Sequence, residues 1–305
     1  MGVNQMFNTT IGIEIEFTGI TRSQAAEIAA DYLEGIVIRT HDSYDTYQVI
    51  TPDGREWQFK RDSSITCQRR VNGRKVEADS TYSVEFVSPI LDYYKDINTI
   101  QELVRKLRTA GGFTTSTCGI HIHLGGHNHT TRSIRNFVNI IASKNDLFYK
   151  SLQIEPARMS YCKKLDEYMV EKMNAKKPKS LDDIADIWYA GSSQASRNSH
   201  YHMSRYHFLN LHSFFTGHKT VELRGFNGTL HAGKIRSYMV LALALNNQAL
   251  TQKSASAKKP QTENEKFAMR TYLNRIGFIG NEFKNCREHL IAHLDGCAAW
   301  RFGAA

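Results

Sequence analysis

Four short segments of this chain carry carboxylate, imidazole or guanidinium side chains in alternation with apolar residues. They read IGIEIEF (11–17), VEFV (84–87), GIHIHLG (119–125) and TVELRGF (220–226). Successive side chains of a strand point to opposite faces of the sheet. Each segment therefore predicts a strand with one apolar face against a core and one face that bears functional groups. In chain order, those groups are Glu14, Glu16, Glu85, His121, His123, Glu222 and Arg224.

If these strands are neighbours in one sheet, their functional groups predict a site for divalent cations. Several carboxylates and imidazoles brought together are costly to bury without cations to neutralise them. Carboxylate oxygens dominate the set, which favours Mg²⁺ or Mn²⁺. Two residues at i and i+2 are about 6.6 Å apart along a strand, so Glu14 and Glu16 are placed to hold two different ions. Two ions beside Arg224 could clamp the phosphates of a nucleotide.

Each pattern alone also has a simpler interpretation. E-x-E is typical of a half-exposed strand whose polar face meets water, and E-x-R is typical of a cross-strand ion pair. H-x-H with one glutamate could instead form the mononuclear metal site of a small β-barrel enzyme. A net charge of +9 favours an anionic partner such as a nucleotide or an acidic polymer, and a nucleic-acid-binding module without catalysis stays a third alternative.

The composition predicts a globular chain that does not span a membrane. Of the 305 residues 41% are hydrophobic, and no apolar run approaches the roughly 20 residues of a transmembrane helix. The N-terminal segment MGVNQMFNTT lacks the features of a signal peptide, so we expect a cytoplasmic protein. The five cysteines form no C-x-x-C pair, which favours reduced thiols over a disulfide framework or a structural zinc site.

Local signals predict an α+β fold with a mostly antiparallel, curved sheet and helices on one face. A capping box at Thr21 and Gln24 begins a helix over 21–34, and Asn72-Gly73 marks a hairpin within an antiparallel stretch over 36–90. Further helices are expected over about 96–111, 131–151 and 233–250, with two more within 261–295. Residues 205–214 and 218–226 are expected to form a pair of strands. We expect a catalytic domain over residues 1–252 and a helical extension over 253–305 packed on it.

The chain resembles the amidoligase family of carboxylate-amine ligases, which share the glutamine synthetase fold. The resemblance rests on IGIEIEF, KRDSSI, VEFVSP, CGIHIHLG, RMSYCKK and HKTVELRGFNGTL, which occur in the order typical of the family over residues 11–231. It does not cover the chain after about residue 252. The resemblance implies a sheet like that of the glutamine synthetase catalytic domain. It also implies ATP-dependent amide formation through an acyl phosphate, with ATP and two Mg²⁺ or Mn²⁺ ions as cofactors.

The resemblance also implies roles for individual residues. The expected substrates are a carboxylate and an amine, each a small molecule or a peptide. The expected metal ligands are Glu14, Glu16, Glu85, His121, His123 and Glu222, with Glu222 and Arg224 as the catalytic pair. The residues expected at the substrate or nucleotide are Asp62, Arg158, Tyr161, Arg224 and Asn227. The second neighbouring glutamate of glutamine synthetase is missing, and Asp62 is its candidate substitute. No acidic flap that would deprotonate ammonia is evident, so the identity of the amine substrate stays open.

Overall fold

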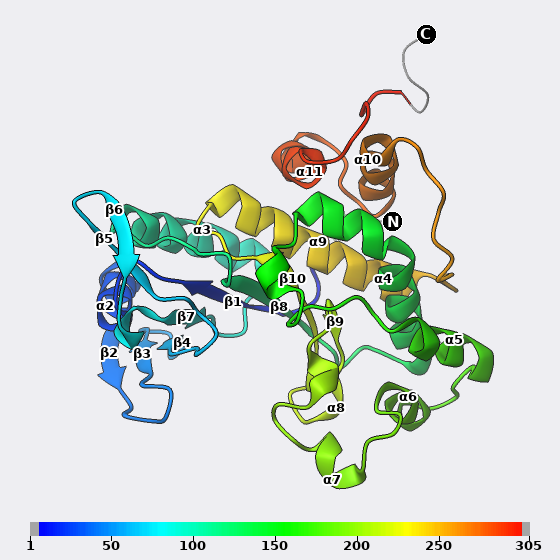
Figure 1. Ribbon diagram of the computed structural model, residues 1–305, viewed down its shortest axis with the longest axis horizontal. Helices are drawn as coiled ribbons and strands as arrows, with labels where there is room; N and C mark the ends of the chain where they lie inside the picture. Colours follow the sequence, from blue (N-terminus) through cyan, green and yellow to red (C-terminus); the bar gives the residue numbers. More distant parts are fainter. Residues whose placement is uncertain (1–5, 301–305) are drawn as a thin grey trace.

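Eight strands form the central sheet of the protein, for which a computed structural model describes residues 6–300 (Figure 1). Their order across the sheet is β2-β3-β4-β7-β1-β8-β10-β9, and neighbouring strands run antiparallel. The strands that carry the functional groups, β7, β1, β8 and β10, therefore lie side by side. The bounds are β1 (Ile11–Phe17), β2 (Ile36–Arg39), β3 (Tyr47–Ile50), β4 (Glu56–Lys60), β7 (Val84–Val87), β8 (Gly119–Gly125), β9 (Leu209–Asn210) and β10 (Thr220–Asn227).

Three long helices cover the apolar face of this sheet. They are α3 (Tyr93–Thr109), α4 (Thr131–Leu152) and α9 (Ala232–Thr251), and they run as one layer above the sheet in Figure 1. The apolar members of the alternating strands, such as Ile13, Ile122 and Leu223, are buried in the core with them. The charged members of the same strands consequently point to the opposite face.

A second pair of helices packs on the outside of that layer. They are α10 (Glu265–Arg275) and α11 (Lys284–Ile291), with the short 3-10 turn η4 (Asn281–Phe283) between them. Helix α11 contacts α9 and α4, on the side away from the sheet (Figure 1). This double coverage explains why α9 is apolar around most of its circumference, as expected of a helix with neighbours on both sides. The boundary of the two expected domains at residue 252 stays a prediction.

Local sequence signals specify helix α2 and the hairpin. Helix α2 (Arg22–Leu33) begins at the expected capping box of Thr21 and Gln24, and Glu34 ends it with a left-handed φ of 55°. Strands β5 (Gln68–Val71) and β6 (Arg74–Glu77) form a separate two-stranded sheet. Asn72 and Gly73 at its turn both have positive φ, as a two-residue hairpin turn of this sequence requires. Both predictions are confirmed.

The expected strand over residues 205–214 is largely wrong. Only β9 pairs there, and it is followed at once by a short helix, α8 (His212–Phe215). Ahead of it lie three further short helices, α5 (Glu167–Lys176), α6 (Leu181–Trp188) and α7 (Gln194–Arg197). Besides η4, the described residues form the 3-10 turns η1 (Ser80–Tyr82), η2 (Pro156–Arg158) and η3 (Met203–Arg205). Helices α6 to α8 lie below β10 in Figure 1, on the side away from α9.

The fold is thus α+β with a large antiparallel sheet, as the sequence predicts. Its apolar face packs against long helices, and its polar face carries the predicted functional groups. Within residues 6–300, no helix combines the length and apolar character needed to cross a membrane.

Candidate metal and active site

The register of the sheet places the functional groups of neighbouring strands directly opposite one another. Glu16 on β1 pairs with Glu85 on β7, and Glu14 on β1 pairs with His121 on β8. His123 on β8 pairs in turn with Glu222 on β10. Residues directly opposite in an antiparallel pair have their side chains on the same face, close enough to interact. Four strands therefore bring their polar side chains to one surface.

The two histidines of H-x-H both approach Glu14. His121 Nδ1 lies 2.9 Å from Glu14 Oε2, and His123 Nε2 lies 3.2 Å from Glu14 Oε1. His121 Nε2 also lies 3.7 Å from Glu16 Oε1. The imidazoles thus stand between carboxylates, where each nitrogen can accept or donate a proton or bind a cation.

Three overlapping groups of carboxylates and imidazoles have the proximity that a metal ion requires. In each group one ligand atom from every residue lies within 4.8 Å of the others. The groups are Glu14 with Glu85 and His121, Glu14 with His123 and Glu222, and Glu16 with Asp62 and Glu85. Glu14 and Glu16 share no group. That they hold different ions stays a prediction.

The negative charges of the site are compensated unequally: nearby histidines offset the charge of Glu14, whereas other carboxylates surround Glu85. Burial alone would raise the pKa of Glu14, but the neighbouring His123 and His121 outweigh it and hold that pKa well below its usual range. At Glu85 the attraction of Lys60, its partner on β4, is outweighed. Burial, followed by repulsion from Glu14, Glu16 and Asp62, raises the pKa of Glu85 well above its ordinary value. A cation near Glu85 would relieve this repulsion.

Glu222, a member of one of these three groups, forms a buried ion pair with Arg224. Arg224 Nη1 donates to Glu222 Oε1 at 2.5 Å, and Asn210 Nδ2 donates to Glu222 Oε2 at 2.5 Å. Burial opposes ionisation of Glu222, but Arg224, His123 and His121 lower its pKa to about 2. Glu222 is therefore a carboxylate at any physiological pH. Asn210 escaped the sequence analysis because nothing local marks a two-residue strand as part of the site.

The donor set fits divalent metal ions. His123 Nε2 is buried and lies close to Glu14, but it is not aligned for a hydrogen bond and has no hydrogen-bond partner within residues 6–300. An orphaned imidazole nitrogen among carboxylates suits a metal ligand. The mixture of several carboxylate oxygens with imidazole nitrogens suits Mg²⁺ or Mn²⁺ better than it suits a thiolate-preferring ion.

Asp62, the candidate substitute for the missing glutamate, lies near Glu16 and Glu85; that it takes this role stays a prediction. It follows β4, and its main chain is tied to the residue before β7, since Asp62 N donates to Ser83 Oγ and that hydroxyl donates to Asp62 O. Asp62 Oδ1 also accepts a hydrogen bond from Ser64 N at 2.6 Å. These contacts hold the loop against β7, so that the Asp62 side chain reaches Glu16 and Glu85.

Two of the residues expected at the substrate are engaged elsewhere. Arg158 is buried, and its guanidinium donates to the carbonyl oxygens of Phe226 and Arg224. Asn227 fixes the end of α4, because its Oδ1 accepts from Glu155 N and its Nδ2 donates to Gln153 O. Both residues position strand β10 rather than face a ligand. Tyr161, by contrast, is exposed, and its carbonyl lies 3.5 Å from Arg224 Nε.

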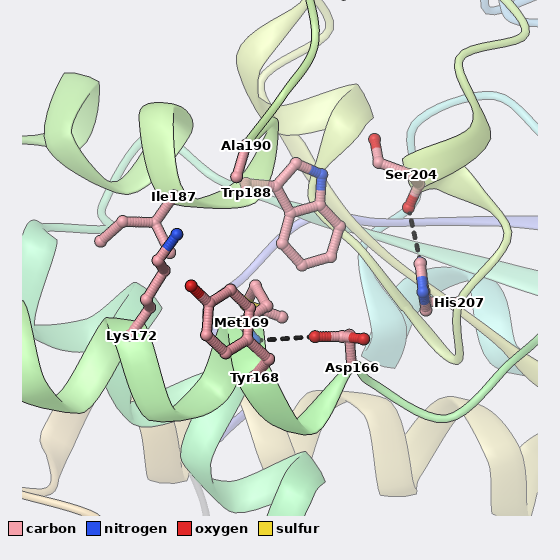
Figure 2. A pocket seen from close by; sticks show the side chains of 9 residues that line it. All are labelled: Asp166, Tyr168, Met169, Lys172, Ile187, Trp188, Ala190, Ser204 and His207. Carbon is pink, nitrogen blue, oxygen red and sulfur yellow. Dashed lines mark hydrogen bonds between the residues drawn. The ribbon is translucent and has the colours of Figure 1, made fainter.

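A separate pocket lies between α5, α6 and the turn before β9 (Figure 2). Its volume is about 310 Å³, and Trp188, Met169 and Ile187 form apolar walls. Figure 2 shows the Trp188 ring between Met169 and His207. His207 precedes Phe208, whose carbonyl accepts a hydrogen bond from Arg224 N. The sequence analysis did not identify this pocket, because its lining comes from separate segments spread over residues 166–207.

Comparison with known proteins places the chain in a family. The search among curated proteins found no matching relative. A family model described as "Putative amidoligase enzyme" matches residues 8–246, a range that contains every residue predicted for the site. That match covers more than half of the chain, and the chain therefore belongs to this amidoligase family.

Proposed function

We propose that the protein is an ATP-dependent carboxylate-amine ligase that forms an amide through an acyl phosphate, with two divalent metal ions. Membership of the family supports a ligase. The observation that carries the finer proposal is the set of three overlapping ligand groups on one sheet face, beside the buried Arg224. Divalent ions held by such a set, together with Arg224, would neutralise two anions that must meet, a substrate carboxylate and the terminal phosphate of a nucleotide.

The three groups of ligands suggest which residues would hold each of the two ions. Glu14, His123 and Glu222 would hold one ion, and Glu16, Asp62 and Glu85 would hold the other. His121 lies between them, near both Glu14 and Glu16. When bound, the ions would supply positive charge that offsets repulsion between carboxylate and phosphate oxygens.

Arg224 is the protein's own cation at this site. Its Nη1 is committed to Glu222 and its Nε to the Tyr161 carbonyl. Its Nη2 makes no hydrogen bond to the part of the chain that the structure describes, and it is free to donate to a phosphate or carboxylate oxygen. Glu222 thus both binds metal and holds the guanidinium in one orientation.

The proposed reaction has two steps. An oxygen of the substrate carboxylate attacks the γ-phosphorus of ATP, the bond to the bridging oxygen breaks, and ADP leaves. The nitrogen of a neutral amine then attacks the acyl carbon, the bond between that carbon and the phosphate oxygen breaks, and phosphate leaves. The amine nitrogen gives up a proton as the amide forms. The sheet face would serve both steps by keeping positive charge near the transferred phosphate.

A single-metal enzyme explains less of the site. It would use the group of Glu14, His123 and Glu222, as an H-x-H site with one or two glutamates. It would leave the close approach of Glu16, Asp62 and Glu85 without a role, although repulsion from the other carboxylates raises the pKa of Glu85. Two ions give a role both to the group of Glu14, His123 and Glu222 and to the group of Glu16, Asp62 and Glu85.

The test is a search for amide products. The protein is incubated with ATP, Mg²⁺ and pooled amino acids, polyamines and peptides, and products are sought that weigh one water less than a carboxylate and an amine together. Hydroxylamine should intercept an acyl phosphate as a hydroxamate, with release of ADP. The Glu16→Gln variant serves as control, since it keeps the side-chain volume and removes a ligand charge. ADP release that is equal in this variant and the wild type would refute the proposal.

A further inference from the structure

A polar pocket lies on the other side of the helical layer from the sheet. Its volume is about 370 Å³, and it opens between α4, α9, the connector after α9 and α10. In Figure 1 these helices stand above the sheet. The functional groups of β1 and β8 alternate with the apolar residues buried in the core, so they belong to the opposite face of the sheet. The pocket is therefore distinct from the metal and active site. It joins the region matched by the family to the helices that follow that region.

Two cations and no acid line this pocket. Lys144 comes from α4 and Arg275 comes from the end of α10, and no aspartate or glutamate is among the lining residues. Neither cation has a carboxylate within 4.0 Å among residues 6–300. Burial, and then repulsion from Arg275, lower the pKa of Lys144. Two like charges that face one cavity without a counter-charge favour an anion between them.

The Lys144 ammonium lies beside an aromatic ring of α10. It is 5.2 Å from the centre of the Tyr272 ring, a cation-π arrangement. Tyr272 is itself anchored, because its hydroxyl donates to Gln248 Oε1 of α9 at 2.7 Å. Ser256 on the connector accepts a hydrogen bond from Lys258 N, so its own hydroxyl hydrogen remains available to a ligand.

We propose that this pocket binds a phosphate-bearing anion, held between the ammonium of Lys144 and the guanidinium of Arg275. A tetrahedral phosphate suits this pair, since the guanidinium presents a planar fork and the ammonium a point charge. The cavity has room for more than a bare phosphate, so inorganic phosphate and a small phosphate ester are both allowed. A bound anion would tie α10 to α4. This inference does not depend on the proposed ligase activity.

The test is calorimetric titration of the whole chain with inorganic phosphate, in chloride buffer of constant ionic strength with a chelator present. The wild type should bind one phosphate per chain. Lys144→Met and Arg275→Gln should each weaken binding about tenfold or more, because each removes a charge-assisted contact. Lys144→Arg keeps the charge and should retain binding. Lys266→Met, which removes one positive charge from α10 outside the pocket, is the matched control and should bind as the wild type does.

Two further measurements separate this pocket from the active site. Arg224→Lys should leave phosphate binding unchanged under chelating conditions, and phosphate should slow hydrogen exchange within residues 265–276. Thermal melting of each variant establishes that it is folded. Equal phosphate affinity in Lys144→Met, Arg275→Gln and the control would overturn the proposal, and so would the absence of any binding by the folded wild type at millimolar phosphate. Loss of binding in Arg224→Lys would also overturn it, because it would place the phosphate at the active site.

Discussion

The guanidinium of Arg158 holds the main chain of Arg224, with Nη2 2.8 Å from the Arg224 carbonyl oxygen. Its Nη1 donates to the Phe226 carbonyl at 2.6 Å. The register between β10 and β8 shifts in this stretch, between Leu223 and Phe226. Arg158 therefore satisfies carbonyl groups at an irregularity of the strand, and it sets the position from which the Arg224 side chain reaches Glu222.

Arg158→Met should destabilise the protein by about 3 kcal/mol, because two buried carbonyl oxygens lose charge-assisted hydrogen bonds. Arg158→Lys should recover only part of this loss, since an ammonium lacks the planar fork that reaches both oxygens. Urea denaturation of the metal-free protein measures both effects. If Arg158 instead lined the substrate site, both variants would unfold like the wild type and lose only turnover.

Glu85→Gln should make the metal-free protein more stable. The pKa of Glu85 is raised by burial and by repulsion from Glu14, Glu16 and Asp62, so the folded state holds its proton more tightly than the unfolded chain does. Stability from this group is present below the unfolded pKa and is lost as the pH rises through the folded value. At neutral pH glutamine removes the penalty, with an expected gain of about 1 kcal/mol.

The same variant should lose most of its stabilisation by Mg²⁺, because it lacks a ligand charge of two of the groups. Melting curves with Mg²⁺ and with a chelator, for variant and wild type, give both quantities. Lowering the pH toward the ordinary glutamate value should narrow the difference between the two metal-free proteins. A metal-free variant less stable than the wild type at neutral pH would contradict our account of Glu85.

Glu222→Gln should have the opposite effect on the metal-free protein. Its pKa of about 2 reflects attraction from Arg224 and the two histidines against the cost of burial. The ion pair contributes stability at neutral pH that is lost as the pH falls through the folded value. Removing the charge leaves the buried Arg224 uncompensated, at an expected cost of about 3 kcal/mol. Urea denaturation beside Glu85→Gln tests the contrast, and a shift of the same sign in both variants would refute it.

Much of the fold could be predicted because its signals are local. The alternation in β1 and β8, the capping box of α2 and the Asn72-Gly73 turn depend on residues a few positions apart. The strand order across the sheet was not accessible, since β1 pairs with strands that follow it by scores of residues. The expected strand over residues 205–214 was too long, because pairing with β10 is limited to β9 and helix α8 begins soon after it.

Some roles in the candidate site could be predicted from local sequence and others could not. The acidic and imidazole residues could be predicted because the faces of single strands display them, and the register then brings them together. The roles of Arg158 and Asn227 could not, because each bonds to main chain distant in the sequence. The anchoring of Glu222 by Asn210 depends on a turn that no local pattern marks.

Arg224→Lys should abolish most turnover while the protein stays folded. A lysine keeps the positive charge next to Glu222, so we expect little change in the free energy of unfolding. It cannot contact Glu222 and a phosphate oxygen through one rigid fork, and the expected loss in kcat/KM is about a hundredfold or more. ADP release assayed with the product search measures it, and wild-type turnover would exclude Arg224 from the reaction.

Gly225→Ala tests how closely the strand behind Arg224 is packed. A Cβ at this position would lie 1.9 Å from Phe208 Cδ2 and 2.1 Å from its Cε2, far inside contact distance. Phe208 is itself buried, and its carbonyl accepts a hydrogen bond from Arg224 N. A shift of the Phe208 ring or of the Gly225 backbone would therefore disturb the site. We expect Gly225→Ala to lower the free energy of unfolding by about 3 kcal/mol and to weaken Mg²⁺ binding.

The double variant Gly225→Ala with Phe208→Leu has more room, and it should be more stable than the sum of the two single changes allows. Simple additivity in urea denaturation would show that Gly225 is required for another reason.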